Sequence, residues 1–287
     1  MAEKDMTEKT LEELNDVFAD MVNALLFDGD SVITEDALSE SNPYSNYTAN
    51  GKIREQERDV VKYWDNNMLH IAKVGFENET TEDADMPLRV LSYDGAAYRS
   101  QFSPQNNDSR FAVATIVLYF GYKKRWTAAK SIYERVKVPD RLRPFVPDYP
   151  INLFEIAYLT DEQVSKFKSD FWFVADYFVQ MRKTGKYIPP TDKIKHVSEL
   201  LGLMSALTDD RRFVEVAEDV KKKENHNMCT VLDEIVAKGK AEGKAEEREE
   251  IQDVYSWLFS LGRGADVEKA TKDEDFYQKM LEEYKNR

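Results

Sequence analysis

The chain has 287 residues, of which 42% are hydrophobic and 12% are aromatic, and its formal net charge is −14. This length and composition predict one large domain with an appendage, or two small domains, and they exclude a globally disordered chain. No run of about 18 apolar residues is present, which excludes a hydrophobic membrane-spanning helix. The negative net charge disfavours non-specific attraction to nucleic acid.

The N-terminal residues and the cysteine content bear on the cellular compartment. The first residues lack the basic-then-apolar order of a secretory signal peptide. The one cysteine, Cys229, excludes an intrachain disulfide and is typical of a reducing compartment. We therefore expect a cytoplasmic protein that has no membrane partner.

The first predicted elements are a helix and a hairpin. Apolar residues recur at i, i+3 and i+4 from Leu14 to Leu25, which predicts a helix with one buried face. Residues 38–51 are rich in Ser, Asn, Tyr and Gly and predict a loop. Strand patterns over 58–64 and 69–77 flank turn residues at 65–67, so we expect an antiparallel hairpin over 57–79.

Helical and strand patterns alternate after the hairpin. A helix is predicted over 86–102, and the unbroken apolar run 112–120 suits a strand buried on both faces. A further strand is predicted over 150–160. A capping-box pattern at Thr160 begins a long helix that extends toward Gly185. Two more amphipathic helices are predicted in 193–222.

The last part of the chain has a different composition. Residues 237–248 predict an exposed helix with i,i+4 ion pairs, and residues 251–261 restore an apolar face. We place a domain at 1–205 and a helical appendage at 206–287, which could support a homo-oligomer. The order of elements predicts an α/β domain around a mixed sheet.

Charge is distributed unevenly along the chain. Residues 1–60 contain 15 acids and 5 bases, whereas residues 123–143 contain 8 bases and 2 acids. A basic segment on an acidic protein indicates an anionic partner, and a solvated helix surface is the alternative.

Two glutamates at the end of the predicted hairpin raise a question of charge compensation. Glu77 and Glu79 share one strand face, because alternate residues of a strand point the same way. The hairpin brings Asp59, at the start of its first strand, beside Glu77. Converging carboxylates suit Mg²⁺ or Mn²⁺, which activate water and neutralise charge on a phosphoryl oxygen. A solvated pair of acids at a strand end is the alternative.

Several short motifs occur in a consistent order over about residues 10–205. They are Asn15-Asp16-x-Phe18, Gly75-x-Glu77-Asn78-x-Thr80, Met86-Pro87-Leu88-Arg89 with Tyr93, and Val117-Leu118-Tyr119-Phe120-Gly121 followed by Trp126. As a set, the motifs resemble the Rpn family of recombination-promoting nucleases and transposases, which belongs to the PD-(D/E)XK nuclease superfamily. The Gly/Ala/Glu/Lys-rich tail also resembles the helical tails of that family.

The resemblance implies a restriction-endonuclease-like core of αβββαβ order, with a mixed sheet flanked by helices and a helical C-terminal extension. It also implies DNA cleavage with Mg²⁺ or Mn²⁺, linked to recombination or mobile elements. Asp59 matches the first-strand aspartate and Glu77 matches the acid of the (D/E)-x-K element. These two residues, and the backbone carbonyl of Asn78, are the implied metal ligands. Asp16 matches an additional polar position of the first helix, and a surface acid is its alternative reading.

The chain departs from the family pattern at position 79. The superfamily has Lys there and this family commonly has Gln, whereas Glu79 cannot donate a hydrogen bond when it is ionised. Glu79 could be a further metal ligand, could abolish catalysis, or could regain a donor if repulsion by Glu77 keeps it protonated. Gln101 is a candidate substitute donor.

The remaining expectations concern the partner. Lys123, Lys124 and Arg125 are the residues that we expect to contact DNA phosphates. The alternative to a nuclease is a catalytically degraded nuclease-fold protein that acts as an interaction or regulatory module.

Overall fold

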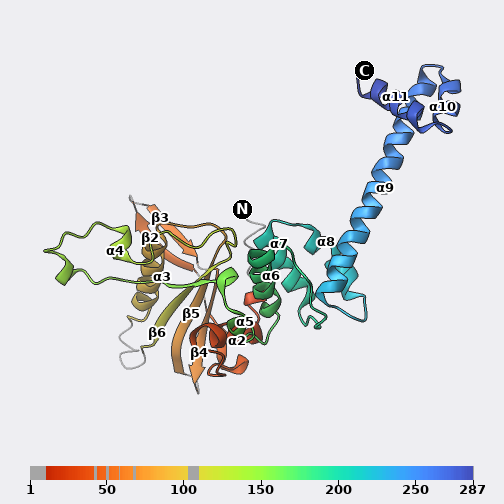
Figure 1. Ribbon diagram of the computed structural model, residues 1–287. Coiled ribbons are helices and arrows are strands. Elements are labelled where there is room, and N and C mark those ends of the chain that lie inside the picture. Colours follow the sequence, from red (N-terminus) through yellow and green to blue (C-terminus); the bar gives the residue numbers. More distant parts are fainter. Residues whose placement is uncertain are drawn as a thin grey trace. The chain divides into compact units, whose positions relative to one another are not determined.

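The computed structural model describes residues 11–41, 44–49, 52–57, 59–66, 69–102 and 110–286 (Figure 1). The N-terminal residues 1–10, the predicted strand start at Arg58 and the predicted turn residue Asn67 lie outside these ranges. The chain divides into two compact units, one up to Val231 and one from Leu232. Each unit is described by itself.

A five-stranded mixed sheet forms the centre of the first unit (Figure 1). Its strands, in spatial order, are β1 (Leu38–Glu40), β4 (Val60–Asn66), β5 (Leu69–Glu79), β6 (Ala112–Tyr119) and β7 (Asn152–Glu155). The pairs β1–β4 and β4–β5 are antiparallel, whereas β5–β6 and β6–β7 are parallel. Strands β2 (Tyr44–Ala49) and β3 (Lys52–Glu57) form a separate two-stranded sheet. The α/β class with a mixed sheet flanked by helices is confirmed.

Helices cover opposite faces of the sheet. On one face, Phe18 of α2 (Asn15–Leu26) packs on Phe76 of β5, with ring centroids 4.8 Å apart. On the other face, Met86 of α3 (Met86–Ser100) belongs to a buried cluster with Val117 of β6. Because successive strand residues alternate between faces, Phe76 lies under α2 and Glu77 lies under α3.

The predicted antiparallel hairpin is confirmed, but the predicted turn at 65–67 was wrong for Asp65 and Asn66, which belong to β4 and pair with β5. Strand β4 pairs with β5 so that Val60 lies opposite Phe76. Asp59 directly precedes β4 and Glu77 directly follows Phe76, so the two acids come at the same end of the hairpin. The prediction of a strand buried on both faces is also confirmed for the second half of β6, where Ile116, Val117 and Leu118 are fully buried.

The predicted loop over 38–51 was wrong, because β1 and β2 lie within that range. Strand β1 is an edge strand that pairs with β4, and Glu40 forms an ion pair with Lys62 at 2.6 Å. Turn-rich local composition does not reveal a pairing partner that lies farther along the chain.

The predicted long helix after Thr160 was also wrong in its length. The capping box forms, but α5 (Asp161–Val164) ends after one turn and α6 (Phe171–Thr184) begins separately. The Asp20 carboxylate of α2 accepts hydrogen bonds from the backbone N–H groups of Lys168 and Ser169. A tertiary contact thus satisfies N–H groups that a continuous helix would satisfy internally.

The other predicted helices are present. Helix α6 ends at Gly185, which adopts the left-handed conformation (φ 68°), and α7 (Val197–Thr208) and α8 (Arg212–Lys221) follow. Strand β7 is shorter than predicted, since a 3₁₀ turn, η4 (Ile156–Tyr158), succeeds it. The short elements η1 (Glu35–Ala37), α4 (Ile132–Arg135) and η3 (Arg143–Phe145) complete this unit.

The second unit is helical. It contains most of α9 (Met228–Ser260), followed by α10 (Gly264–Ala270) and α11 (Glu274–Lys285). A small core joins the end of α9 to the two short helices, with Val254, Leu258, Val267, Tyr277 and Leu281 buried. In the described part of the chain, no helix combines the length and the apolar character needed to cross a bilayer.

Candidate active site

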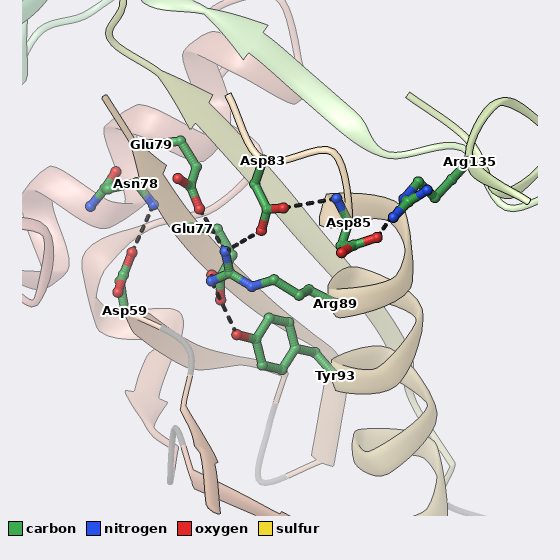
Figure 2. Close-up of polar contacts among 9 residues, drawn as sticks. All are labelled: Asp59, Glu77, Asn78, Glu79, Asp83, Asp85, Arg89, Tyr93 and Arg135. Carbon is green, nitrogen blue, oxygen red and sulfur yellow. Dashed lines mark hydrogen bonds and ion pairs between the residues drawn. The ribbon is translucent and has the colours of Figure 1, made fainter. Parts of the chain in front are cut away.

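Three carboxylates contact one guanidinium where β5 leads into α3 (Figure 2). Arg89 Nη2 donates to Glu77 Oε2 at 2.9 Å. Its Nη1 donates to Glu79 Oε1 at 2.8 Å and to Asp83 Oδ2 at 3.0 Å. Arg89 therefore compensates the two like charges that share the face of β5.

Local sequence explains how Arg89 reaches the strand. Pro87 lies in the first turn of α3, where its missing N–H and fixed φ are tolerated. The short connection from β5 places this first turn over the end of the strand. The Arg89 guanidinium consequently points toward Glu77 and Glu79. Its two terminal nitrogens can each donate to a different carboxylate, which the single ammonium of a lysine would do less well.

Burial and charge act in opposite directions on Arg89. Burial disfavours its charged form, but the negative charge of Glu77 and the hydrogen bonds with Tyr93 and Asp83 outweigh burial and raise the Arg89 pKa. The Glu77 side chain is only 1% exposed, whereas that of Arg89 is 37% exposed. Glu77 is therefore a buried carboxylate whose described ion-pair partner is Arg89.

Asp59 and Glu77 act on the same hydroxyl group. Arg89 Nη2 lies 3.4 Å from the Tyr93 hydroxyl oxygen. Burial, and after it the negative charges of Glu77 and Asp59, raise the pKa of Tyr93. Both carboxylates thus lie within electrostatic reach of the Tyr93 hydroxyl group beneath α3.

Asn78 connects this site to two other parts of the chain. Its backbone N–H donates to Asp59 Oδ2 at 2.7 Å, and its side-chain amide donates to Glu12 Oε2 at 2.7 Å. Glu12 is fully buried. Asn78, which lies between the two glutamates, therefore holds the Asp59 carboxylate through its backbone. Its own side chain is held by Glu12.

The electrostatic balance of the site favours a cation. Asp59, Glu77, Glu79 and Asp83 are four acidic residues, and in the described part of the chain Arg89 forms ion pairs with three of them. Mg²⁺ is usually bound through one or two carboxylates and keeps several waters. Asp59 and Glu77, which come at the same end of the hairpin, offer two such carboxylates. They do not fit an ion held by three side chains, since the described ranges contain no group of three His, Cys, Asp or Glu residues placed to hold a metal.

Glu79 is not directed toward Asp59 but toward Arg89. Burial raises its pKa above 4.5, the charges of Asp83 and Asp59 add to this effect, and Arg89 opposes it. The main cause of the raised Glu79 pKa is therefore burial, and not the repulsion by Glu77 that the sequence led us to expect. Glu79 takes up a proton more readily than an exposed glutamate does.

Gln101 lies at the other end of α3. Its Oε1 accepts from Phe111 N at 2.9 Å, and its Nε2 donates to Phe111 O at 3.2 Å and to Ala97 O at 3.3 Å. Gln101 and Arg89 are 12 positions apart, about 18 Å along a helix. The structure does not bring Gln101 to Glu79, and its amide holds the residue that precedes β6.

Asp16 also lies apart from the carboxylates. Its Oδ2 accepts from Lys195 Nζ at 2.6 Å and lies 2.9 Å from His196 Nε2. Burial opposes ionisation, but the hydrogen bonds from His196 and Lys195 prevail and lower the Asp16 pKa. Asp16 joins α2 to the residues before α7.

The predicted phosphate contacts lie just beyond the end of β6. Lys124 forms an ion pair with Glu82, and Arg125 pairs with Glu155 at 3.1 Å and lies over the Tyr158 ring. Lys123 makes no ion pair with any residue that the structure describes, and its ammonium lies 6.0 Å from the centre of the Tyr122 ring. Lys123 and Lys124 line an open cleft of about 500 Å³ that also includes Thr80 and Thr81, the two residues after Glu79.

Three residues of the site escaped sequence reasoning in their present roles. The sequence assigned Arg89 only to a motif, and it indicated no site role for Glu12 or Asp83. A strand followed after a short connection by a Pro-initiated helix was the available signal for Arg89. No family model matches the chain, and neither a curated protein nor a solved structure matches it.

Proposed function

We propose that the chain is a metal-dependent DNA endonuclease with a PD-(D/E)XK-type core of the Rpn-like class, linked to recombination or mobile elements. The order of elements supports this proposal. With the β2–β3 hairpin set aside, α2, β1, β4, β5, α3 and β6 follow the αβββαβ order that the resemblance implies. The observation that carries the proposal is the acidic pair Asp59 and Glu77 at one end of the β4–β5 hairpin, with Glu77 buried.

The proposed roles follow from the contacts around the pair. Asp59, Glu77 and the backbone carbonyl of Asn78 would hold Mg²⁺ or Mn²⁺. When bound, such an ion supplies a more nucleophilic water and stabilises charge on a phosphoryl oxygen. Arg89 orients Glu77 and neutralises one charge of the cluster.

The cleft beyond β6 would hold the DNA backbone. Lys123 and Lys124 line this cleft beside the residues that follow Glu79, and Arg125 lies next to them in the chain. Ammonium groups at this place would contact phosphates and contribute a salt-dependent part of the affinity.

The direct test is cleavage of supercoiled plasmid DNA by the purified protein with Mg²⁺ or Mn²⁺. We expect nicked and linear products with either ion, and no cleavage after chelation by EDTA. Absence of cleavage with both ions would reject an active nuclease and favour the second candidate below.

Glu79 provides a sharper test of the site. In Glu79→Gln, the amide oxygen still accepts from Arg89 while the new NH₂ group can donate to a phosphate or a water. Since one such donor contributes about 10²–10³-fold to catalysis in other enzymes, we expect cleavage to rise about tenfold or more. The matched control is Asp83→Asn, which also removes a charged partner of Arg89 but lies outside the strand. An equal rise in cleavage in both variants would show that loss of a negative charge near Arg89, and not the new donor, causes the effect.

The same substitution changes how stability depends on pH. The folded protein binds the Glu79 proton more tightly than the unfolded chain does, so the free energy of unfolding falls as pH rises from about 4.5 through the raised pKa. Glu79→Gln removes this loss. We expect the variant to gain stability over the wild type near neutral pH, with the gain disappearing below the normal pKa of glutamate, in urea unfolding followed by circular dichroism.

The second candidate is a degraded nuclease-fold protein that acts as an interaction or regulatory module. The contacts of Arg89 with Glu77, Glu79 and Asp83 favour it, since an internal cation already compensates part of their negative charge. Inactivity of the wild type, with cleavage gained by Glu79→Gln or Glu79→Lys, would support this candidate.

We also propose that the second unit mediates homo-oligomer formation. Phe259, in the last turn of α9, and Leu261, just after this helix, are exposed apolar residues. We expect light scattering to give an oligomer for the full chain and a monomer for a chain that ends after Gly239, which retains the buried residues Met228 and Val231. An unchanged oligomeric state of the shortened chain would contradict this role.

A further inference from the structure

Residues 131–150 form a projection on the first unit, which includes α4 and η3 and connects β6 to β7 (Figure 1). Its two ends are joined by a β-bridge between Ser131 and Pro150. A hydrogen bond from Ile132 N to Tyr149 O, 3.3 Å long, reinforces the junction. The segment between these ends is largely exposed to solvent.

The projection is ordered by its own contacts. The Tyr133 hydroxyl oxygen lies 2.5 Å from Val146 O and 3.0 Å from Arg143 O. The Tyr133 backbone N–H donates to Asp148 at 2.9 Å, and the Arg143 guanidinium lies over the Tyr133 ring. A surface that is ordered before binding loses less conformational entropy when it binds a partner.

The end of the projection exposes apolar and basic side chains together. Phe145 is 80% exposed and Leu142 is 50% exposed. Residues 135–146 contain four bases and one acid, although the whole chain has a net charge of −14. Lys137 and Arg141 form no ion pair with any residue in the described ranges. Cationic groups beside exposed apolar side chains match a partner that offers both phosphates and base surfaces.

The projection is attached to the helix that carries Arg89. Arg135 forms an ion pair with Asp85, which directly precedes α3 (Figure 2). At the other end of the projection, the Tyr149 hydroxyl donates to Asp94 Oδ2 at 2.6 Å, and Asp94 also accepts from Thr115. Asp85 and Asp94 flank Arg89 in sequence, so the projection is joined to the chain on both sides of Arg89.

We propose that residues 131–150 bind double-stranded DNA beside the carboxylate site. Lys137 and Arg141 contact phosphates, and Phe145 and Leu142 pack against base pairs that are unstacked where the projection meets the duplex. Proteins that insert such apolar side chains bend the duplex and bury more of it. This inference rests on the proposed function only in taking DNA as the partner.

The test measures DNA binding without cleavage. The full chain is titrated onto a fluorescein-labelled duplex in EDTA at several salt concentrations. Each phosphate contact makes the slope of log K against log salt more negative by about 0.9. Lys137→Ala with Arg141→Ala should therefore reduce the magnitude of that slope by about 2. We expect affinity to fall about tenfold or more. Lys221→Ala with Lys222→Ala, at the end of α8, is the matched control, and it should leave slope and affinity unchanged.

The apolar contact has its own readout. In a duplex that contains 2-aminopurine, unstacking increases the fluorescence of that base. Wild type should produce this increase, and Phe145→Ala should abolish it while retaining the salt dependence. Because Phe145 is exposed, its replacement should leave the thermal unfolding midpoint unchanged. Absence of a fluorescence increase with the wild type would overturn base contact by Phe145.

The outcomes separate this inference from the proposed function. Glu77→Gln should still bind the duplex. Loss of DNA binding in the Lys137/Arg141 variant would support the inference. If the wild type then cleaves DNA with no metal tested, the proposed nuclease activity is rejected while the inference stands. Metal-dependent cleavage with unchanged binding by that variant would overturn the inference and keep the nuclease. Absence of DNA binding by the wild type would overturn the inference.

Discussion

Glu77→Gln is expected to reduce metal-dependent plasmid cleavage by about 10²–10³-fold, by analogy with the loss of one catalytic electrostatic contact. Glutamine keeps the volume of the side chain, and its amide oxygen can still accept from Arg89. What it removes is the negative charge that a divalent cation requires of a ligand. The measurement is the initial rate of nicking at saturating Mg²⁺ and Mn²⁺, compared with the wild type.

Two comparisons make this result specific. Glu218→Gln removes an exposed carboxylate of α8 and should leave the rate unchanged. Asp59→Asn should reduce the rate as Glu77→Gln does, since the two residues are the proposed ligand pair. A Glu77→Gln protein that is folded by circular dichroism and cleaves at the wild-type rate would refute the assignment of the site.

Arg89→Ala is expected to lower the free energy of unfolding by about 2–4 kcal/mol. The substitution leaves Glu77 buried, beside Glu79 and Asp83, without the guanidinium that contacts all three carboxylates. Loss of one partner of a buried ion pair costs about 3–5 kcal/mol, and the partial exposure of Arg89 reduces that cost. Urea unfolding near neutral pH measures the difference.

The effect of Arg89→Ala should depend on pH. Without Arg89, the buried Glu77 has a raised pKa in the folded variant, so the variant loses stability as pH rises above the normal glutamate range. The difference between variant and wild type should therefore be smaller near pH 5 than at neutral pH. A pH-independent difference would show that lost packing, and not an uncompensated charge, is the cause.

Arg135→Ala is the matched control for stability. Arg135 and Asp85 form an ion pair between exposed side chains, and such pairs contribute about 0–1 kcal/mol. Arg89→Lys retains the charge but not the forked geometry, and it should fall between the two alanine variants. If Arg89→Ala were as mild as Arg135→Ala, Arg89 would not be the main compensating charge of the site.

The parts of the fold that depend on local pattern could be predicted from the sequence. The hairpin followed from alternating strand residues around a turn, and this register put Asp59 beside Glu77. Helix α3 and strand β6 followed from Pro87 and from the apolar run at 112–120. Each of these signals is contained within a few neighbouring residues.

The parts that depend on distant partners could not be predicted. Strand β1 forms by pairing Leu38–Glu40 with β4. In the segment between α5 and α6, Asp20 of α2 binds the N–H groups of Lys168 and Ser169. The site divides in the same way. Spacing placed Glu77 and Glu79 on one face, but the contacts of Arg89 with both glutamates depend on how α3 packs on the sheet.

Asn78 has a consequence for the order in which the protein folds. Its two hydrogen bonds reach Asp59, 19 positions earlier, and Glu12, 66 positions earlier. Contacts of such long separation form only after large loops close, which delays them relative to helices and turns. The central residue of the Glu-Asn-Glu triplet thus ties the acidic site to the N-terminal part of the first unit, and the contact with Glu12 is expected to form later than the β4–β5 hairpin.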